Sequence, residues 1–151
     1  MKTRRETLKQ SAVVAGLLAS AGFPQFTHAS VNKAAFDAKT VQDAARAAGA
    51  KSMAESKDVT IIGPDIAENG AVVPLGASTT LSGVKQLLIM VEKNPSALVA
   101  LFNVTDAVDV NFSTRAKMGQ SSDVYAVALM NDGRALWAKK EVKVTLGGCG
   151  G

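Results

Sequence analysis

The sequence predicts a mainly β domain: an immunoglobulin-like antiparallel β-sandwich with an N-terminal helix and a flexible C-terminal arm. Three observations support this prediction. From residue 59 onward, short runs rich in β-branched residues alternate with turn residues, at the spacing typical of a sandwich. No helical pattern separates these runs, so the βαβ rhythm of a parallel sheet is missing. Residues 147–151 are four glycines and one cysteine, a composition that favours no regular structure.

Residues 1–29 have the features of a twin-arginine export signal. Arg4 and Arg5 precede a leucine, a lysine and the apolar stretch 12–21, which is too short for a permanent membrane span. A proline then breaks the stretch, and small residues fit a cleavage site after Ala29. We therefore expect export through the twin-arginine pathway, a periplasmic mature protein and no membrane anchor.

The segment 34–48 predicts a helix. It is rich in alanine and in charged helix formers, and Gly49 directly after it is suited to a C-terminal cap. Its thin apolar stripe predicts that the helix packs on another element. The stripe consists of Phe36, Val41, Ala44, Ala45 and Ala48.

Six to eight short strands are expected after the helix, within a carrier domain that spans residues 30–146. Asn131-Asp132-Gly133 predicts a hairpin turn, and Val142, Val144 and Leu146 alternate as expected for one face of the last strand. The predicted strands are residues 59–62, 71–75, 84–91, 97–104, 109–114, 124–130, 135–138 and 142–146.

Removal of residues 1–29 changes the charge of the chain. Of 17 Lys and Arg residues and 13 Asp and Glu residues, four and one lie in this segment, which leaves 13 against 12. A nearly neutral chain has no basic footprint for nucleic acid. The single histidine, His28, is removed too, so one mature chain can form neither a Cys/His zinc site nor a Cys–His catalytic pair. We expect no metal and no cofactor.

Cys149 is the only cysteine, so it cannot form an internal disulfide. The glycines beside it supply no side chains to enclose the sulfur, and three residues after Leu146 reach roughly 10 Å when extended. We therefore predict a nucleophilic thiol on a flexible arm, with the catalytic groups supplied by other proteins. The arm glycines are Gly147, Gly148, Gly150 and Gly151.

Four segments of the chain resemble the SoxY family, the sulfur-carrier subunits of the bacterial thiosulfate-oxidising Sox system. They are residues 64–74, 92–95, 116–119 and 142–151, and the last of them is the most specific. The resemblance covers the whole mature chain, and it extends to the type of leader.

The resemblance implies a carrier rather than an enzyme. In this family the residue that matches Cys149 holds thiosulfate and its oxidation intermediates covalently. A haem-containing cytochrome conjugates thiosulfate to the thiol, a metal-dependent hydrolase releases sulfate, and a sulfur dehydrogenase oxidises the remaining sulfane sulfur. The family's carriers work as heterodimers with a second β-sandwich protein, SoxZ.

Other functions are weighed against this one. An exported structural sandwich would use Cys149 for an intermolecular disulfide, although flanking glycines leave such a link open to exchange. A ubiquitin-like carrier activated at its terminal carboxylate would need ATP and would give the thiol no role. Asp65 and Glu68 could form an acid–base pair, but the neighbouring Asn69-Gly70 favours a polar turn.

Overall fold

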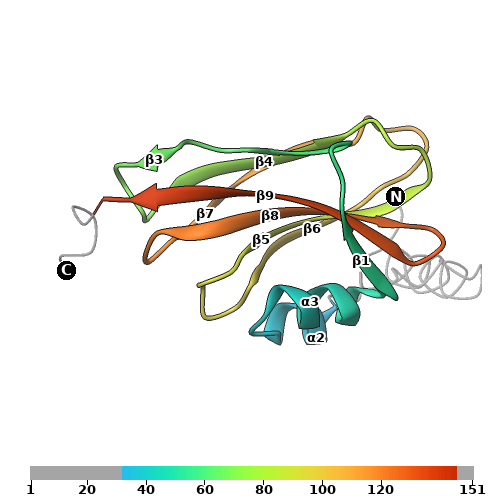
Figure 1. Cartoon of the computed structure of the whole chain (residues 1–151), viewed down its shortest axis with the longest axis horizontal. Coiled ribbons are helices and arrows are strands. Elements are labelled where there is room, and N and C mark those ends of the chain that lie inside the picture. The colour runs from blue at the N-terminus through green and yellow to red at the C-terminus, as the bar shows by residue number, and fades with distance from the viewer. Residues whose placement is uncertain (1–31, 146–151) are drawn as a thin grey trace, which may run out of the picture. The chain divides into compact units, whose positions relative to one another are not determined.

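The computed structural model describes residues 32–145 of the 151-residue chain (Figure 1). Within this range, two short helices, α2 (Lys33–Asp37) and α3 (Val41–Ala48), precede nine strands. The strands are β1 (Ser52–Glu55), β2 (Val59–Ile62), β3 (Ile66–Ala67), β4 (Val73–Thr79), β5 (Val84–Val91), β6 (Leu98–Asn103), β7 (Asn111–Ala116), β8 (Ser122–Met130) and β9 (Arg134–Val144).

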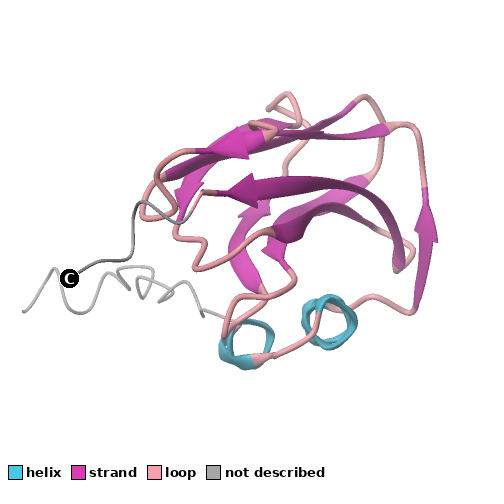
Figure 2. Ribbon diagram, turned by 60° about the vertical axis from the view of Figure 1, so that its left-hand side comes forward, coloured by secondary structure: helices cyan, strands magenta, loops and turns pink. Residues whose placement is uncertain are grey.

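The strands form two sheets that pack face to face. The larger sheet has the order β1-β9-β8-β5-β6, with β3 also paired to β9, and the smaller sheet has the order β2-β4-β7. The two helices cover the outer face of the larger sheet, so the described part of the molecule has three layers (Figure 2). The predicted β-sandwich with helical structure at its N-terminal side is confirmed.

Strand β5 is buried on both of its faces. Leu87, Ile89 and Val91 point into the core between the two sheets, whereas Leu88 and Met90 pack toward the helices. Every side chain from Leu87 to Val91 is fully buried. A continuous apolar run, rather than an alternating one, is the pattern expected for a strand that lies between two layers.

The predicted single helix over 34–48 is wrong in one respect, because it is two helices. Ala38 is extended (ψ 137°), and its carbonyl oxygen accepts a hydrogen bond from the backbone N–H of Ala97 at 3.1 Å. Thr40 then caps α3, since its hydroxyl oxygen accepts from the backbone N–H of Asp43 at 3.1 Å. Gly49 ends α3 with φ 116°, which confirms the predicted cap.

Two of the predicted strands, residues 135–138 and 142–146, are one strand in the structure. Strand β9 pairs with β8 along its length, from Ala135 opposite Leu129 to Val142 opposite Ser122, so the charged residues between the two predicted segments do not interrupt it. Other strand boundaries shift by a few residues, whereas 59–62 and 84–91 agree with β2 and β5. The hairpin at residues 131–133 is confirmed, with Gly133 at φ 91°.

Two strands were not predicted, and both depart from antiparallel pairing. Strand β1 runs parallel to the first part of β9, and β3 runs parallel to its last part. Neither short segment carries a run of apolar residues that would indicate a strand. Within residues 32–145, no helix has the length and apolar character that crossing a bilayer requires.

Candidate functional site

The predicted site residue Cys149 and the glycines of its arm, Gly147, Gly148, Gly150 and Gly151, lie outside the described residues, as does the predicted leader 1–29. The structure therefore describes the site at its base, where β9 ends at Val144 and Thr145 follows. We call this end of the sandwich, formed by residues 63–72, 92–95, 116–122 and 142–145, the arm-base end.

Strand β3 holds one edge of the last residues of β9. Ile66 lies opposite Lys143 and Ala67 lies opposite Val144 in parallel register. The backbone N–H of Lys143 donates to the carbonyl oxygen of Asp65 at 3.0 Å, and that of Thr145 donates to Ala67 at 3.1 Å. The backbone is thus fixed by regular strand pairing up to the last described residue.

A serine hydroxyl holds the other edge of the same residues. Ser122, the first residue of β8, lies opposite Val142, and the pairing between β8 and β9 ends there. Beyond it, the backbone N–H of Val144 donates to the hydroxyl oxygen of Ser121 at 2.9 Å, so a side chain replaces the missing strand. The last residues of β9 are therefore hydrogen-bonded on both sides, and they present a fixed attachment point for the arm.

A buried glycine lies against this attachment point. The backbone N–H of Met118 donates to the carbonyl oxygen of Gly70 at 2.7 Å, and the Met118 side chain is fully buried. A β-carbon on Gly70 would lie 2.4 Å from the Met118 carbonyl oxygen and 2.8 Å from Cγ1 of Val144. The close approach of these two loops to β9 is therefore possible only because residue 70 has no side chain.

A third loop, residues 92–95, joins the same end. The side-chain amide of Asn94 donates to the carbonyl oxygen of Lys117 at 2.8 Å, and the backbone N–H of Lys93 donates to the Ser122 hydroxyl oxygen at 3.1 Å. The hydrogen bonds thus connect loops that are far apart in the sequence. Described residues from all four segments that carried the resemblance in the sequence meet at the arm-base end.

Lys140 of β9 binds the segment just before β3 through a hydrogen bond and an ion pair. Its ammonium donates to the Gly63 carbonyl oxygen at 2.7 Å and forms an ion pair with Asp65 at 2.8 Å. The hydrogen bond and the charge of Lys140 lower the pKa of Asp65 below its ordinary value. A general acid near neutral pH would require the opposite shift.

The proposed acid–base pair of Asp65 and Glu68 is thus not supported by the structure. Both residues are exposed on the loop between β2 and β4, and Asp65 is already engaged by Lys140. The Asn69 side chain accepts from the backbone N–H of Ala71 at 2.9 Å, which is the turn chemistry that the sequence indicated.

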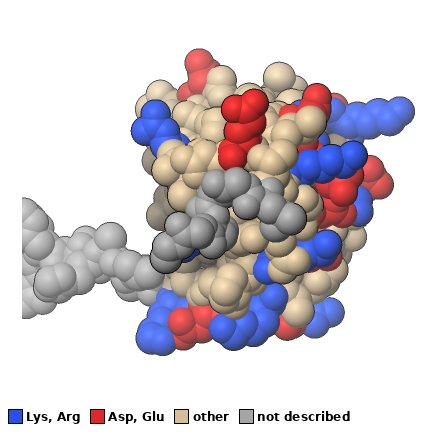
Figure 3. Space-filling view, turned by 90° about the vertical axis from the view of Figure 1, so that its left-hand side faces the viewer, with Lys and Arg blue, Asp and Glu red and all other residues tan. Residues whose placement is uncertain are grey.

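The arm-base end carries exposed charges of both signs, on Asp65, Glu68, Glu92, Lys93, Lys117 and Lys143. Figure 3 looks at this end, and both basic and acidic side chains are visible on it. Two of the exposed large apolar side chains, Ile66 of β3 and Val72 just before β4, also belong to this end, with exposed fractions of 56% and 52%. The surface of this end thus combines charged side chains with two exposed apolar ones.

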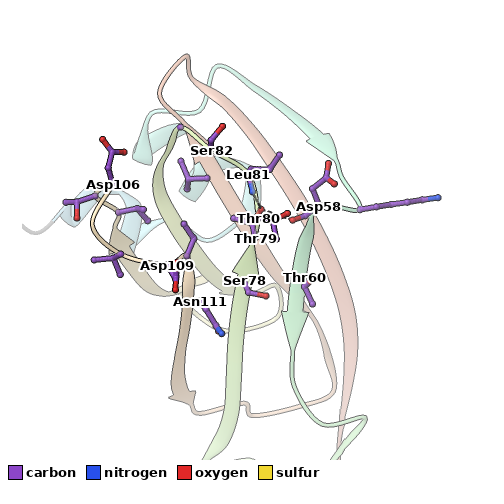
Figure 4. A pocket seen from close by; sticks show the side chains of 17 residues that line it. Asp58, Thr60, Ser78, Thr79, Thr80, Leu81, Ser82, Asp106, Asp109 and Asn111 are labelled. Atoms are coloured by element: carbon purple, nitrogen blue, oxygen red, sulfur yellow. Dashed lines mark hydrogen bonds between the residues drawn. The ribbon is translucent and has the colours of Figure 1, made fainter.

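A pocket of about 740 Å³ lies elsewhere in the described part of the molecule (Figure 4). It is lined by residues around the start of β2, by the end of β4 with the loop that leads to the start of β5 (residues 78–84), and by the segment from Val104 to Asn111. Because β5 and β9 run in the same direction, the start of β5 and the end of β9 lie at opposite ends of the sheet. This pocket is therefore remote from the arm. Among residues 32–145, no group of three or more His, Cys, Asp or Glu side chains is arranged to hold a metal ion.

Sequence reasoning did not find β3, Ser121 or the role of Gly70 at this end. Each of them contacts the backbone of a residue that is distant in the chain. A local sequence pattern does not indicate such a partner. The turn signal at Asn69-Gly70 was the only indication of them in the sequence.

Comparisons with known proteins agree with this geometry. The family model described as sulfur oxidation protein SoxY matches residues 44–149. The solved structure of the sulfur carrier protein SoxY from Chlorobium limicola f thiosulfatophilum is 34% identical, covers 70% of this chain and 96% of its own, and superposes with a TM-score of 0.62. No curated protein sequence matches the chain.

Two more distant structures share the fold alone. Superoxide reductase (neelaredoxin) from Ignicoccus hospitalis is 15% identical over 58% of this chain and 79% of its own, with a TM-score of 0.51. A putative superoxide reductase from Thermotoga maritima is 9% identical over 62% and 94%, with a TM-score of 0.52. The family match over residues 44–149, together with the 34% identity to a solved member, shows that the chain belongs to the SoxY family.

Proposed function

We propose that the chain is a carrier that holds thiosulfate-derived sulfur intermediates covalently on Cys149 during sulfur oxidation. One observation carries this proposal: the family match extends from α3 to residue 149, and residue 149 is the only cysteine of the chain. The match therefore includes the one thiol that the carrier chemistry requires. The fixed attachment point at Val144 and Thr145 fits this function, because it supports the base of the arm firmly.

The chemistry begins with the Cys149 thiolate and thiosulfate. The cysteine sulfur bonds to the sulfane sulfur of thiosulfate, and the two electrons released pass to a haem-containing cytochrome. Water then cleaves the bond between the outer sulfur and the sulfone group, which releases sulfate and leaves a persulfide on Cys149. The hydrolase that catalyses this step and the dehydrogenase that oxidises the persulfide sulfur are separate proteins in this proposal.

Partners and location complete the proposal. The carrier forms a heterodimer with a SoxZ-type β-sandwich subunit in the periplasm, after export through the twin-arginine pathway. The transient enzyme partners contact the arm-base end, where Ile66 and Val72 are exposed beside the end of β9.

Intact-mass spectrometry of the chain purified from its own cells tests the covalent step. We expect adducts on Cys149 with the mass of thiosulfate or of additional sulfur atoms, which increase when the cells oxidise thiosulfate. A control chain with Cys149→Ser should carry none. A disulfide-linked dimer as the only modified form would favour the structural alternative instead, and a terminal thiocarboxylate would favour the ubiquitin-like one.

A further inference from the structure

Strand β9 extends beyond the strand that pairs with it inside the sheet. The pairing between β8 and β9 ends where Val142 lies opposite Ser122, whereas β9 itself continues to Val144. Residues 143–145 therefore project past the end of β8. We call these three residues the overhang, and the segment with the single cysteine of the chain follows directly after it.

The backbone amides of the overhang point alternately to two sides, as expected for an extended strand. The amides of Lys143 and Thr145 point to one side, where they donate to carbonyl oxygens of the segment that contains β3. The amide of Val144 points to the other side, beyond the end of β8, and it donates to the Ser121 hydroxyl oxygen at 2.9 Å. On that side, a single side chain thus takes the place of a strand.

The position of Ser121 is itself fixed by the residue that follows it. Ser122 is 2% exposed and is the one buried polar residue within residues 32–145. Its hydroxyl accepts from the backbone N–H of Lys93 at 3.1 Å and donates to the carbonyl oxygen of Asp123 at 3.0 Å. Because the start of β8 is held in this way, Ser121 presents its hydroxyl to Val144 from a defined position.

We propose that Ser121 is a positioning residue for Cys149, because it keeps the overhang on the sandwich and thereby sets the free length of the arm. With the overhang held, the thiol is four residues beyond Thr145, roughly 13–14 Å when extended. With the overhang released, it is seven residues beyond Val142, roughly 23–25 Å. The inference rests on the proposed carrier function and adds to it a residue outside the arm.

The free length of the arm acts on delivery of the thiol in two opposite ways. A longer tether lowers the effective concentration of the thiol in a partner's active site, which falls roughly as the −3/2 power of tether length. Lengthening from four to seven residues therefore lowers this concentration about twofold. A longer tether also reaches further, which helps only where the arm is too short for the site. Loss of Ser121 should thus have opposite effects on an arm of native length and on a shortened arm.

Amide exchange read by NMR tests whether Ser121 holds the overhang. In Ser121→Ala, the amides of Val144 and Thr145 should exchange roughly three to ten times faster, the effect of one lost hydrogen bond on local opening. Ser121→Thr keeps a hydroxyl oxygen and should restore the rates of the parent chain. Ser82→Ala, at an exposed serine of the opposite end of the sandwich, is the control and should leave both amides unchanged.

Conjugation of thiosulfate to Cys149 tests the role in delivery. The reaction is run with the haem-containing cytochrome, oxidised and in excess so that it accepts both electrons, and the adduct is followed by intact mass. In Ser121→Ala, kcat/KM for conjugation should fall about twofold, and Ser121→Thr should restore it. The rate of Cys149 alkylation by iodoacetamide should be the same in all three chains, because a small reagent needs no delivery.

A shortened arm separates positioning from simple stabilisation of the fold. Deletion of Gly147 should slow conjugation, because the thiol no longer reaches the bottom of the partner's active site. In this shortened chain, Ser121→Ala should raise kcat/KM, since release of the overhang returns the missing length. A residue that only stabilises the sandwich would lower conjugation at both arm lengths.

Two results would overturn the proposal. Unchanged exchange of the Val144 and Thr145 amides in Ser121→Ala would show that the hydroxyl does not hold the overhang. Faster exchange together with the same change in conjugation at both arm lengths would show that Ser121 does not position the thiol. Absence of any adduct on the parent chain would instead overturn the carrier function, and the role of Ser121 in delivery with it, whereas the exchange rates would still report the hydrogen bond.

Discussion

The backbone N–H of Met118 donates to the carbonyl oxygen of Gly70 at 2.7 Å, in a contact where a β-carbon on Gly70 would lie 2.4 Å from the Met118 carbonyl oxygen. The obstacle is a backbone atom, which cannot rotate away as a side chain would. This contact joins two loops of the arm-base end, and Val144 of β9 lies against the same glycine.

Gly70→Ala should therefore destabilise the domain by about 1–3 kcal/mol, the usual cost of forcing an extra carbon into a packed site. Urea denaturation measures this loss. Gly119→Ala is the matched control, because a β-carbon there meets no atom within 4 Å. Equal free energies of unfolding for the two variants would show that the loops relax freely around residue 70.

The Asp65–Lys140 ion pair should tighten β3 against β9. In Asp65→Asn, we expect the backbone amides of Lys143 and Thr145 to exchange roughly two to five times faster, a modest effect because the pair is exposed. Hydrogen exchange read by NMR measures it. Asp37→Asn, which removes an exposed ion pair on α2, is the control and should leave these amides unchanged.

The same pair should give a defined pH dependence. The pKa of Asp65 is lowered in the folded state, so its stabilising effect is present above its ordinary pKa and is lost as the pH falls through the folded value. The difference in exchange between the parent chain and Asp65→Asn should be constant above about pH 5 and should shrink as the pH falls below the ordinary pKa of aspartate. A difference that persists at the lowest pH would mean that the charge of Asp65 is not its cause.

We expect the arm glycines to determine how readily Cys149 enters the active sites of the partner enzymes, rather than how reactive its thiol is. Changing Gly147 and Gly148 to valine should leave the rate of alkylation of Cys149 by a small reagent unchanged. Turnover by the sulfur-oxidising partner enzymes should slow, because β-branched side chains widen and stiffen the arm. Glu141→Val, the same kind of side chain within β9, should change neither rate. Undiminished turnover with the valine arm would remove the argument for a narrow, flexible arm.

We expect the leader to direct the export of the β-sandwich partner as well as of this chain. Changing Arg4 and Arg5 to lysine should retain both the carrier and its β-sandwich partner in the cytoplasm, if the two fold together before export. Fractionation followed by immunoblotting measures both, with Lys2→Arg as the control. Arrival of the partner in the periplasm without the carrier would contradict joint export and would not affect the carrier proposal.

The sequence correctly predicted those strands whose degree of burial is reflected in the pattern of their own apolar residues. Strand β5 was predicted with its observed ends, because a strand buried on both faces is apolar throughout and is bounded by turns. Strand β9 was divided in two, because Lys139, Lys140 and Glu141 lie between its apolar positions. The ion pairs of the two lysines, with Asp123 and Asp65, are visible only in three dimensions.

The thiol and its glycines were apparent from the sequence, whereas the base of the arm was not. A lone cysteine among glycines is a local pattern. The support of Val144 by Ser121 and of Thr145 by Ala67 depends on residues 23 and 78 positions away. Short segments such as β3 form strands only because β9 is already beside them, so propensity does not reveal them.

The parallel pairing of β3 with β9 also has a consequence for the order of events in the cell. The partners of Thr145 lie 77 and 78 residues earlier, so nearly the whole domain must be synthesised before this pairing can close. Contacts of such long sequence separation form late, because they carry the largest loop-closure cost. A nascent or misfolded chain would thus lack the rigid base of the arm, and a partner that recognises this base would load sulfur only onto carriers that have finished folding.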